Sequence, residues 1–158
     1  MISSPTKSRL TEVYIKTFQA VRNHSVHLCK PLAVEDYIPQ PMEDVSPPKW
    51  HLGHTTWFFE TFILSKFYPN YQVFNADFGF LFNSYYNHAG ERVLRKNRGF
   101  LTRPLVEEVY AYRTYVDEKM LQLLQNKPAS AVLELLEIGL NHEQQHQELL
   151  VYDIKYIL

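Results

Sequence analysis

Cysteine, glycine and long apolar runs are all scarce in this sequence, and each scarcity excludes a class of protein. Cys29 is the single cysteine among 158 residues, which excludes an internal disulfide and favours a reducing compartment such as the cytoplasm. The opening segment MISSPTKSRL has no apolar run, so we expect no signal peptide. No stretch is apolar over enough residues to span a membrane. Cys29 follows Val26, His27 and Leu28 and is predicted to be an inert core residue.

An excess of charge of either sign is also missing. The sequence has 16 Lys and Arg against 17 Asp and Glu, which gives a formal net charge of -1. We therefore expect no nucleic-acid partner and no attraction to an anionic membrane surface. Hydrophobic residues make up 46% and aromatic residues 15% of the chain, which is typical of a globular protein with a core rich in rings. A chain of this length fits one core, so residues 1–158 are predicted to form a single domain.

Apolar residues recur at helical spacing through most of the chain, and no alternating pattern typical of a strand is found. The predicted helices run from about Thr6 to Cys29, Pro48 to Phe67, Phe78 to His88, Pro104 to Gln125, and Ala129 to the end. The proline-rich segment 30–49 is predicted to be a long loop across the end of the domain, with Ser46 as the N-cap of the next helix. The basic segment 89–104 is predicted to be another loop. These elements predict an all-α fold, an antiparallel four-helix bundle with a long first crossover.

The last predicted helix contains the sequence HEQQH, which places two histidines four residues apart. An α-helix turns through about 400° in four residues, so His142 and His146 face the same way, about one turn apart. That spacing allows two imidazoles to bind one metal ion. Both histidines lie in an apolar stripe that is predicted to be buried. The stripe comprises Leu135, Ile138, His142, His146, Leu149, Leu150 and Ile157.

The second predicted helix contains another inward-facing histidine. His54 lies in a stripe of large apolar residues, whereas His51 lies one position off this stripe, near its edge. The stripe comprises Trp50, His54, Trp57, Phe58, Thr61, Phe62 and Ser65. Because histidines on facing helices of a bundle can converge on one ion, His54, His142 and His146 are the predicted metal ligands, the alternative being hydrogen-bonded core histidines. The other histidines off this stripe are assigned no metal role: His24, His27 and His88.

HEQQH also matches the zinc-protease pattern H-E-x-x-H, in which Glu143 would be the general base that activates water. This interpretation is not favoured. Such proteases take a third ligand from well downstream, and only 12 residues follow His146, all on the same predicted helix. Glu148 lies about 200° around the helix from His146 and faces away from the ion. No edge strand is predicted to hold a peptide substrate, and Glu143 is predicted to be a solvated helix residue.

Four longer motifs occur in order along the chain: SPPKWHLGHTTWFFE, FNSYY, RKNRGFLTRP and GLNHEQQHQELLVYDIK. Together they resemble the N-terminal domain of the EgtB family, the sulfoxide synthases of ergothioneine biosynthesis, from about Arg9 to the last residue. The resemblance implies a DinB-like four-helix bundle. It also implies part of an iron(II)-dependent oxidoreductase, which holds non-haem iron with three histidines. That enzyme joins γ-glutamylcysteine or cysteine to C2 of the hercynine imidazole with O₂, forming a sulfoxide.

The resemblance implies a ligand set as well. The family's His-x₃-His-x-Glu motif matches His142, His146 and Glu148, and its Leu-Gly/Ala-His step assigns the first ligand to His54 rather than His51. This assignment agrees with the apolar stripes. The family metal is Fe(II), but three histidines also suit Zn²⁺, so zinc or nickel can displace iron during purification.

Substrate-binding residues follow from the same resemblance. Arg95 and Arg98 in RKNR match two family arginines that hold the carboxylates of the thiol, and guanidinium groups bind carboxylates through paired hydrogen bonds. Arg92 and Arg103 are weaker matches. Gln145 matches a residue near the histidine-derived substrate. Without the resemblance, this basic segment would be interpreted as an ordinary loop.

The family continues into a second domain, which resembles the formylglycine-generating enzymes and supplies the sulfur-acceptor pocket and a catalytic tyrosine. We expect that domain to be absent from this chain, so no catalytic residue is assigned. A domain of this kind in trans would complete the site, and an uncovered aromatic face favours a homodimer. Two alternatives stay open. One is a stand-alone DinB-like metal-dependent thiol S-transferase, which needs no O₂, and the other is a non-catalytic metal-binding module.

Overall fold

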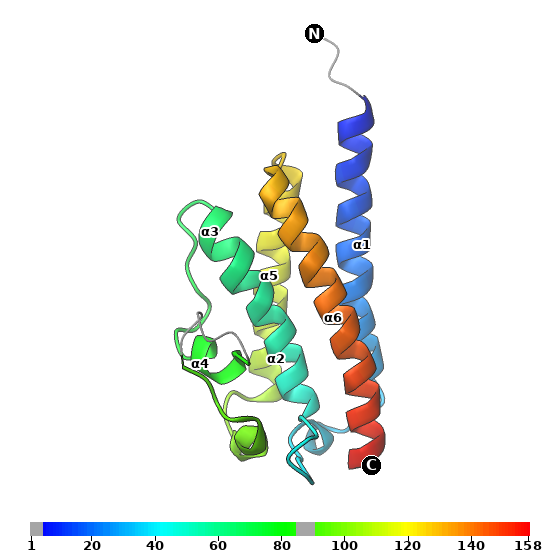
Figure 1. The fold of residues 1–158 in the computed structure, drawn as a ribbon, viewed down its shortest axis with the longest axis vertical. Helices are drawn as coiled ribbons and strands as arrows, with labels where there is room; N and C mark the ends of the chain where they lie inside the picture. Colours follow the sequence, from blue (N-terminus) through cyan, green and yellow to red (C-terminus); the bar gives the residue numbers. More distant parts are fainter. Residues whose placement is uncertain (1–4, 85–90) are drawn as a thin grey trace.

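Helices account for the regular secondary structure of the described part of the chain. The computed structural model describes residues 5–84 and 91–158, and no strand occurs in these two ranges. The bundle is formed by four long helices: α1 (Pro5–Cys29), α2 (Pro48–Phe59), α5 (Val106–Gln125) and α6 (Ser130–Ile157) (Figure 1). The predicted all-α fold is therefore confirmed. No helix in these ranges is both long enough and apolar enough to cross a membrane.

The order of the helices around the bundle follows from their contacts. α1 and α2 each pack against α5 and α6, so α1 and α2 occupy opposite corners. The first connection, residues 30–47, joins these corners across one end of the bundle and contains the short 3₁₀ helix η1 (Val34–Tyr37). The second connection joins residues 67 and 106, and its described parts, residues 68–84 and 91–105, contain α4 (Phe78–Phe82) and η4 (Arg95–Phe100). In Figure 1, α2 and α5 both run upward, while α1 and α6 run downward.

The helix that begins with α2 continues to Phe67, as predicted, but it includes a π-helical turn. This turn, η2, spans Glu60–Leu64 and is followed by α3 (Ser65–Phe67). The carboxylate of Glu60 is buried, and it accepts hydrogen bonds from the hydroxyl groups of Tyr71 and Tyr112. Glu60 therefore links this turn both to the second connection and to α5.

The start of α2 differs from the prediction in its cap. Pro47 is the N-cap residue, and Pro48 is the first helical residue, a position that suits proline because its missing N–H would have no partner there. Ser46, the predicted cap, instead turns toward the second connection, where its hydroxyl accepts a hydrogen bond from Arg98 at 2.8 Å. The backbone N–H of Ser46 donates to the carboxylate of Asp153 on α6 at 2.9 Å.

The third predicted helix is shorter than expected. α4 ends at Phe82 rather than at His88, and residues 85–90 lie outside the described residues. The last carbonyl groups of a helix have no partner within it. The carbonyl oxygen of Phe82 finds its partner in the ring of His54, at 2.6 Å. The end of α4 thus contributes to the orientation of a predicted metal ligand.

α2 is buried on all sides, because α5 and α6 cover one part of its surface and α4 packs on another. Trp50, Trp57 and Phe59 are at most 2% exposed. Burying an aromatic side chain of this size stabilises a fold by roughly 1.5–3 kcal/mol. α2 is therefore the central helix of the core, and any polar group on it needs a partner from a neighbouring element.

The buried face of α6 differs from the predicted stripe. Ile138 and Leu149 were predicted to be buried but are 54% and 41% exposed, whereas Glu143 is fully buried. The buried residues of α6 are Val132, Leu136, Gly139, Leu140, Glu143, Gln147, Leu150 and Asp153. The helical wheel assigned every carboxylate to the surface. The buried face that it predicts is therefore rotated about the helix axis relative to the observed one. His142 and His146 lie at the edge of the buried face and are partly exposed.

Gly139 permits the close contact between α6 and the α2 region. A Cβ atom at this position would lie 2.5 Å from the ring of Phe59, well inside the contact distance of two carbon atoms. Phe59 is fully buried, so its ring cannot move without displacing its own neighbours.

We predict that Gly139→Ala destabilises the protein by about 1–3 kcal/mol, the usual cost of overpacking a core. Gly79→Ala is the matched control, because a Cβ at Gly79 would have open space around it. Urea unfolding followed by circular dichroism measures both variants. Equal stability of the two variants would contradict this packing of α6.

Candidate metal centre

Three histidines from two helices converge beside one cavity. His54 belongs to α2, and His142 and His146 belong to α6, where their four-residue spacing places them on the same side of the helix. One ring nitrogen of each histidine lies within 4.8 Å of the others. The Nε2 atoms of His54 and His142 are 3.1 Å apart. Two imidazole nitrogens on one tetrahedral zinc ion lie about 3.3 Å apart, so the His54–His142 pair already has the spacing of two ligands on one ion, and the cluster could hold a metal ion.

The surroundings keep the three rings neutral. Burial lowers the pKa of His54 well below its ordinary value, and the neighbouring His142 lowers it further. Burial also lowers the pKa of His142, to about 4. The pKa of His146 is lowered by burial and then by the nearby imidazoles of His54 and His51. A neutral imidazole keeps a lone pair, which is the form that binds a metal ion.

The hydrogen bonds of the rings indicate where the lone pairs point. His54 donates from Nδ1 to the carbonyl oxygen of Phe82, which leaves its lone pair on Nε2. Nδ1 of His142 is buried and has no hydrogen-bond partner among the described residues. Nδ1 of His142 thus lacks a described partner in either tautomer. With the proton on Nδ1, two lone pairs face each other across 3.1 Å, and with the proton on Nε2, His142 donates to His54. A cation between the two Nε2 atoms makes the facing lone pairs favourable, so this donor set fits a metal ion.

The cavity next to these rings has a volume of about 260 Å³. Its walls bring the predicted substrate residues Arg95, Arg98 and Gln145 together with the three histidines. A larger hollow of about 650 Å³ lies beside the end of α3, and no histidine, cysteine or carboxylate is among its described lining residues. Of these two cavities, the smaller one therefore has the side chains that commonly bind a metal ion.

The two arginines of this cavity are held to different degrees. Arg98 is 5% exposed, and its guanidinium lies 3.3 Å from the centroid of the Trp50 ring, in a cation–π contact. It also donates hydrogen bonds to two serine hydroxyl groups. Arg95 is exposed and donates to the backbone carbonyl of Asp44. Arg98 thus forms a fixed wall, whereas Arg95 and the exposed Gln145 lie at the rim.

His51 and Asp153 also line the cavity, and the sequence pattern assigned a role to neither. His51 was placed near the edge of the buried stripe, but it is only 3% exposed. Its Nδ1 lies 3.0 Å from Nδ1 of His146, and its Nε2 lies 2.8 Å from the Asp153 carboxylate. The signal in the sequence was the spacing of seven residues between His146 and Asp153, which is about two helical turns and places both on one face.

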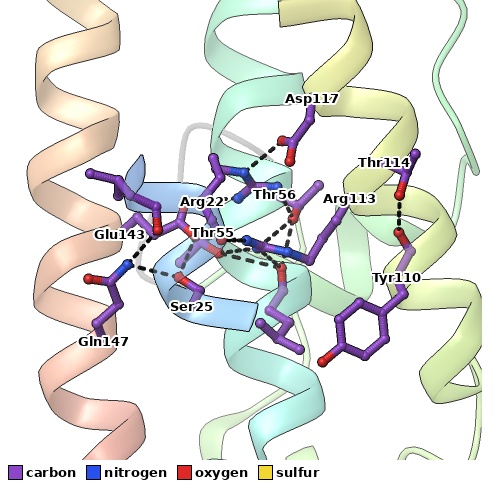
Figure 2. A network of polar contacts seen from close by, with 12 residues as sticks. Arg22, Ser25, Thr55, Thr56, Tyr110, Arg113, Thr114, Asp117, Glu143 and Gln147 are labelled. Carbon is purple, nitrogen blue, oxygen red and sulfur yellow. Dashed lines mark hydrogen bonds and ion pairs between the residues drawn. The ribbon is translucent and has the colours of Figure 1, made fainter. Parts of the chain in front are cut away.

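Glu143, the glutamate of HEQQH, points into the core rather than toward solvent, so the prediction of a solvated residue is wrong. Figure 2 shows its carboxylate among residues from the neighbouring helices. It accepts hydrogen bonds from Arg22 at 2.8 Å, from Arg113 at 3.0 Å and from the Ser25 hydroxyl at 2.6 Å. A carboxylate held by two guanidinium groups cannot serve as the general base of a zinc protease.

Burial alone would raise the pKa of Glu143, but the charges of Arg22 and Arg113 outweigh it and lower the pKa to about 2. The carboxylate is therefore ionised at neutral pH although it is fully buried. A second acid, Asp117, bonds to Arg22 at 2.7 Å, so two carboxylates balance the two guanidinium groups (Figure 2).

The residues that were predicted to lie outside the site do so where the structure describes them. Cys29 is buried, and burial raises the pKa of its thiol to about 11, which agrees with an inert core residue. His24 and His27 are exposed on α1, where their rings stack on each other. Glu148 is exposed, as expected from its angle on α6. His88 lies outside the described residues.

A family model described as the DinB superfamily matches residues 17–150. The chain belongs to the DinB superfamily. The match includes α2, the second connection and the part of α6 that carries both histidines, so the whole three-histidine cluster lies within the DinB-like domain. A search of curated proteins found no match.

We predict that Glu143→Gln destabilises the DinB-like domain by about 3–5 kcal/mol, because the buried charges of Arg22 and Arg113 then lose the carboxylate that they share. Glu148→Gln is the matched control, because it makes the same change at an exposed position of the same helix. It is expected to change stability by at most about 0.5 kcal/mol. Urea unfolding of the metal-free domain at pH 7 measures both.

A comparison of wild type with Glu143→Gln also tests the charge of Glu143. Its folded pKa of about 2 lies below its ordinary value of 4.5. Its contribution to stability is therefore present above about pH 4.5 and is lost as the pH falls toward 2. The difference in unfolding free energy between wild type and Glu143→Gln should shrink over this range. A difference that does not depend on pH would contradict an ionised Glu143.

Proposed function

We propose that the DinB-like domain is the metal-binding domain of a non-haem Fe(II) sulfoxide synthase of ergothioneine biosynthesis, like the EgtB family that its motifs resemble. The proposed reaction joins γ-glutamylcysteine or cysteine to C2 of hercynine with O₂. One oxygen atom ends in the sulfoxide, and the other leaves as water with the hydrogens of the thiol and of C2. The observation that carries the proposal is the shared cavity, in which three histidines lie beside two arginines and Gln145.

The proposed metal ligands are His54, His142 and His146. Iron held there would supply the redox chemistry with O₂. Three neutral imidazoles add no negative charge, so the ion would keep its double positive charge and positions that are not filled by protein. The same donors accept zinc or nickel, and either metal can accompany the purified domain.

Arg95 and Arg98 are proposed to bind the carboxylates of the thiol substrate. With a divalent ion, the two guanidinium groups make the cavity strongly positive, which is complementary to an anionic thiol. Because Arg98 is already held against Trp50, it loses little freedom when a ligand binds. Arg95 is exposed and can follow the second carboxylate of γ-glutamylcysteine. Gln145 is proposed to contact hercynine.

In the EgtB family, the acceptor pocket and the catalytic tyrosine come from a formylglycine-generating-enzyme-like domain. We propose that such a domain, in the same chain or in trans, covers the open side of this cavity. Leu149 lines the cavity and is 41% exposed, which suits an apolar contact with that domain. Without it, the same surface would favour a homodimer. The single, buried cysteine suits a cytoplasmic enzyme.

The test uses the domain loaded anaerobically with Fe(II), with nitric oxide as a stand-in for O₂. The EPR spectrum should contain an iron–nitrosyl signal that shifts when γ-glutamylcysteine is added. The signal should be lost in His54→Ala, because one of the three proposed ligands is removed. Failure of the wild-type domain to bind iron, or an unchanged signal in His54→Ala, would contradict the proposed ligands.

Arg95→Gln separates thiol binding from metal binding. It should leave the iron signal unchanged and weaken the response to γ-glutamylcysteine by roughly tenfold or more, because a charged hydrogen bond contributes about 1.5–3 kcal/mol. Arg103→Gln is the control, since Arg103 is exposed and does not line the cavity. An iron signal that never responds to thiol would favour a non-catalytic metal module. Conjugation of a thiol to an electrophile without O₂ would favour a thiol S-transferase.

A further inference from the structure

A chain of hydrogen bonds runs from the buried carboxylate of Asp153 to the three-histidine cluster. The Asp153 carboxylate lies 2.8 Å from Nε2 of His51, and Nδ1 of His51 lies 3.0 Å from Nδ1 of His146. Asp153 and His51 are each 3% exposed, so water competes little for these bonds. The proposed metal ligand His146 is thus connected through a second imidazole to a negative charge.

The positions of the protons along this chain follow from its donors and acceptors. The Asp153 oxygen that contacts His51 also accepts the backbone N–H of Ser46, so it acts as an acceptor. Nε2 of His51 must then carry the proton of a neutral imidazole, which leaves a lone pair on Nδ1. That lone pair can accept only a donated N–H, so the proton of His146 lies on Nδ1. Nε2 of His146 is left with the lone pair that a metal ion needs.

Each of the other two proposed ligands has a different arrangement. His54 is oriented by a backbone carbonyl, that of Phe82. Nδ1 of His142 has no hydrogen-bond partner among the described residues. Within the described part of the chain, only His146 of these three rings has its second nitrogen hydrogen-bonded to a side chain, and that side chain, His51, comes from α2. Groups that hold the second nitrogen of a ligating histidine fix its tautomer and raise its basicity.

We propose that His51, backed by Asp153, is a positioning residue for the metal centre that fixes the proton of His146 on Nδ1 and presents Nε2 to the ion. This inference rests on the proposed three-histidine metal site and adds two residues to it. His51 belongs to the first turn of α2 and Asp153 to the last turns of α6. This chain of hydrogen bonds therefore also connects the two helices that supply the proposed ligands.

The first experiment needs no metal. Long-range ¹⁵N–¹H NMR of the metal-free wild-type domain at about pH 7.5 reports which nitrogen of each histidine carries the proton. His146 is expected to be protonated on Nδ1 and unprotonated on Nε2. Protonation of His146 on Nε2, or on both nitrogens, would contradict the proposed chain of hydrogen bonds, whether or not the domain binds a metal ion. This measurement on wild type does not depend on whether any variant folds.

The second experiment compares two substitutions of His51. His51→Leu removes both hydrogen bonds, and it should release the His146 tautomer and weaken zinc or cobalt binding about 10–100-fold. His51→Gln keeps an acceptor for His146 and a donor for Asp153, so it should restore most of the affinity. His27→Gln, at an exposed histidine, is the control and should change neither readout. Affinities are measured by competition with a chelator, and the cobalt absorption spectrum reports the ligand geometry.

The outcomes separate this inference from the proposed function. If wild type binds the metal and both His51 variants bind it equally well, the positioning role is wrong while the metal site stands. If His146 has the expected tautomer but wild type binds no metal, the proposed function fails, and His51 is then a core hydrogen-bond partner without a positioning role. Loss in His51→Leu with recovery in His51→Gln supports the proposal.

Discussion

The burial of the Glu143 carboxylate between two arginines fixes the rotation of the last helix, and the three-histidine cluster depends on that rotation. Arg22 from α1 and Arg113 from α5 both bond to this one side chain (Figure 2). His142 comes one residue before Glu143, and His146 comes three residues after it. Because Glu143 points into the core, both histidines are turned toward α2. The HEQQH sequence therefore combines a structural anchor with two candidate ligands, and its glutamate acts as the anchor rather than as a base.

The candidate metal centre lies where α6 meets α2, and it depends on elements outside both helices. The second connection covers α2 and supplies the carbonyl of Phe82 to orient His54. The same connection brings Arg98 against Trp50, on the wall of the cavity. The DinB-like bundle thus brings the three rings together, while the exposed Arg95 lies at the rim of the cavity.

The helices and the three histidines could be predicted from the sequence because both depend on local spacing. His142 and His146 are one turn apart, and His54 lies in a continuous apolar stripe. The burial of Glu143 and the role of His51 could not be predicted, because their partners are distant along the chain. Arg22 is 121 residues from Glu143, and Asp153 is 102 residues from His51. A helical wheel places such polar residues at the surface, since it contains no information about compensating charges on other helices.

The measurement that tests the metal centre most directly is an anomalous difference map from a crystal of the zinc- or cobalt-loaded domain. One peak is predicted, at about 2.0–2.1 Å from a ring nitrogen of each of His54, His142 and His146. Its contact with His146 should be through Nε2. A peak at the stacked surface pair His24 and His27 instead, or no peak near His54, His142 and His146, would contradict the account.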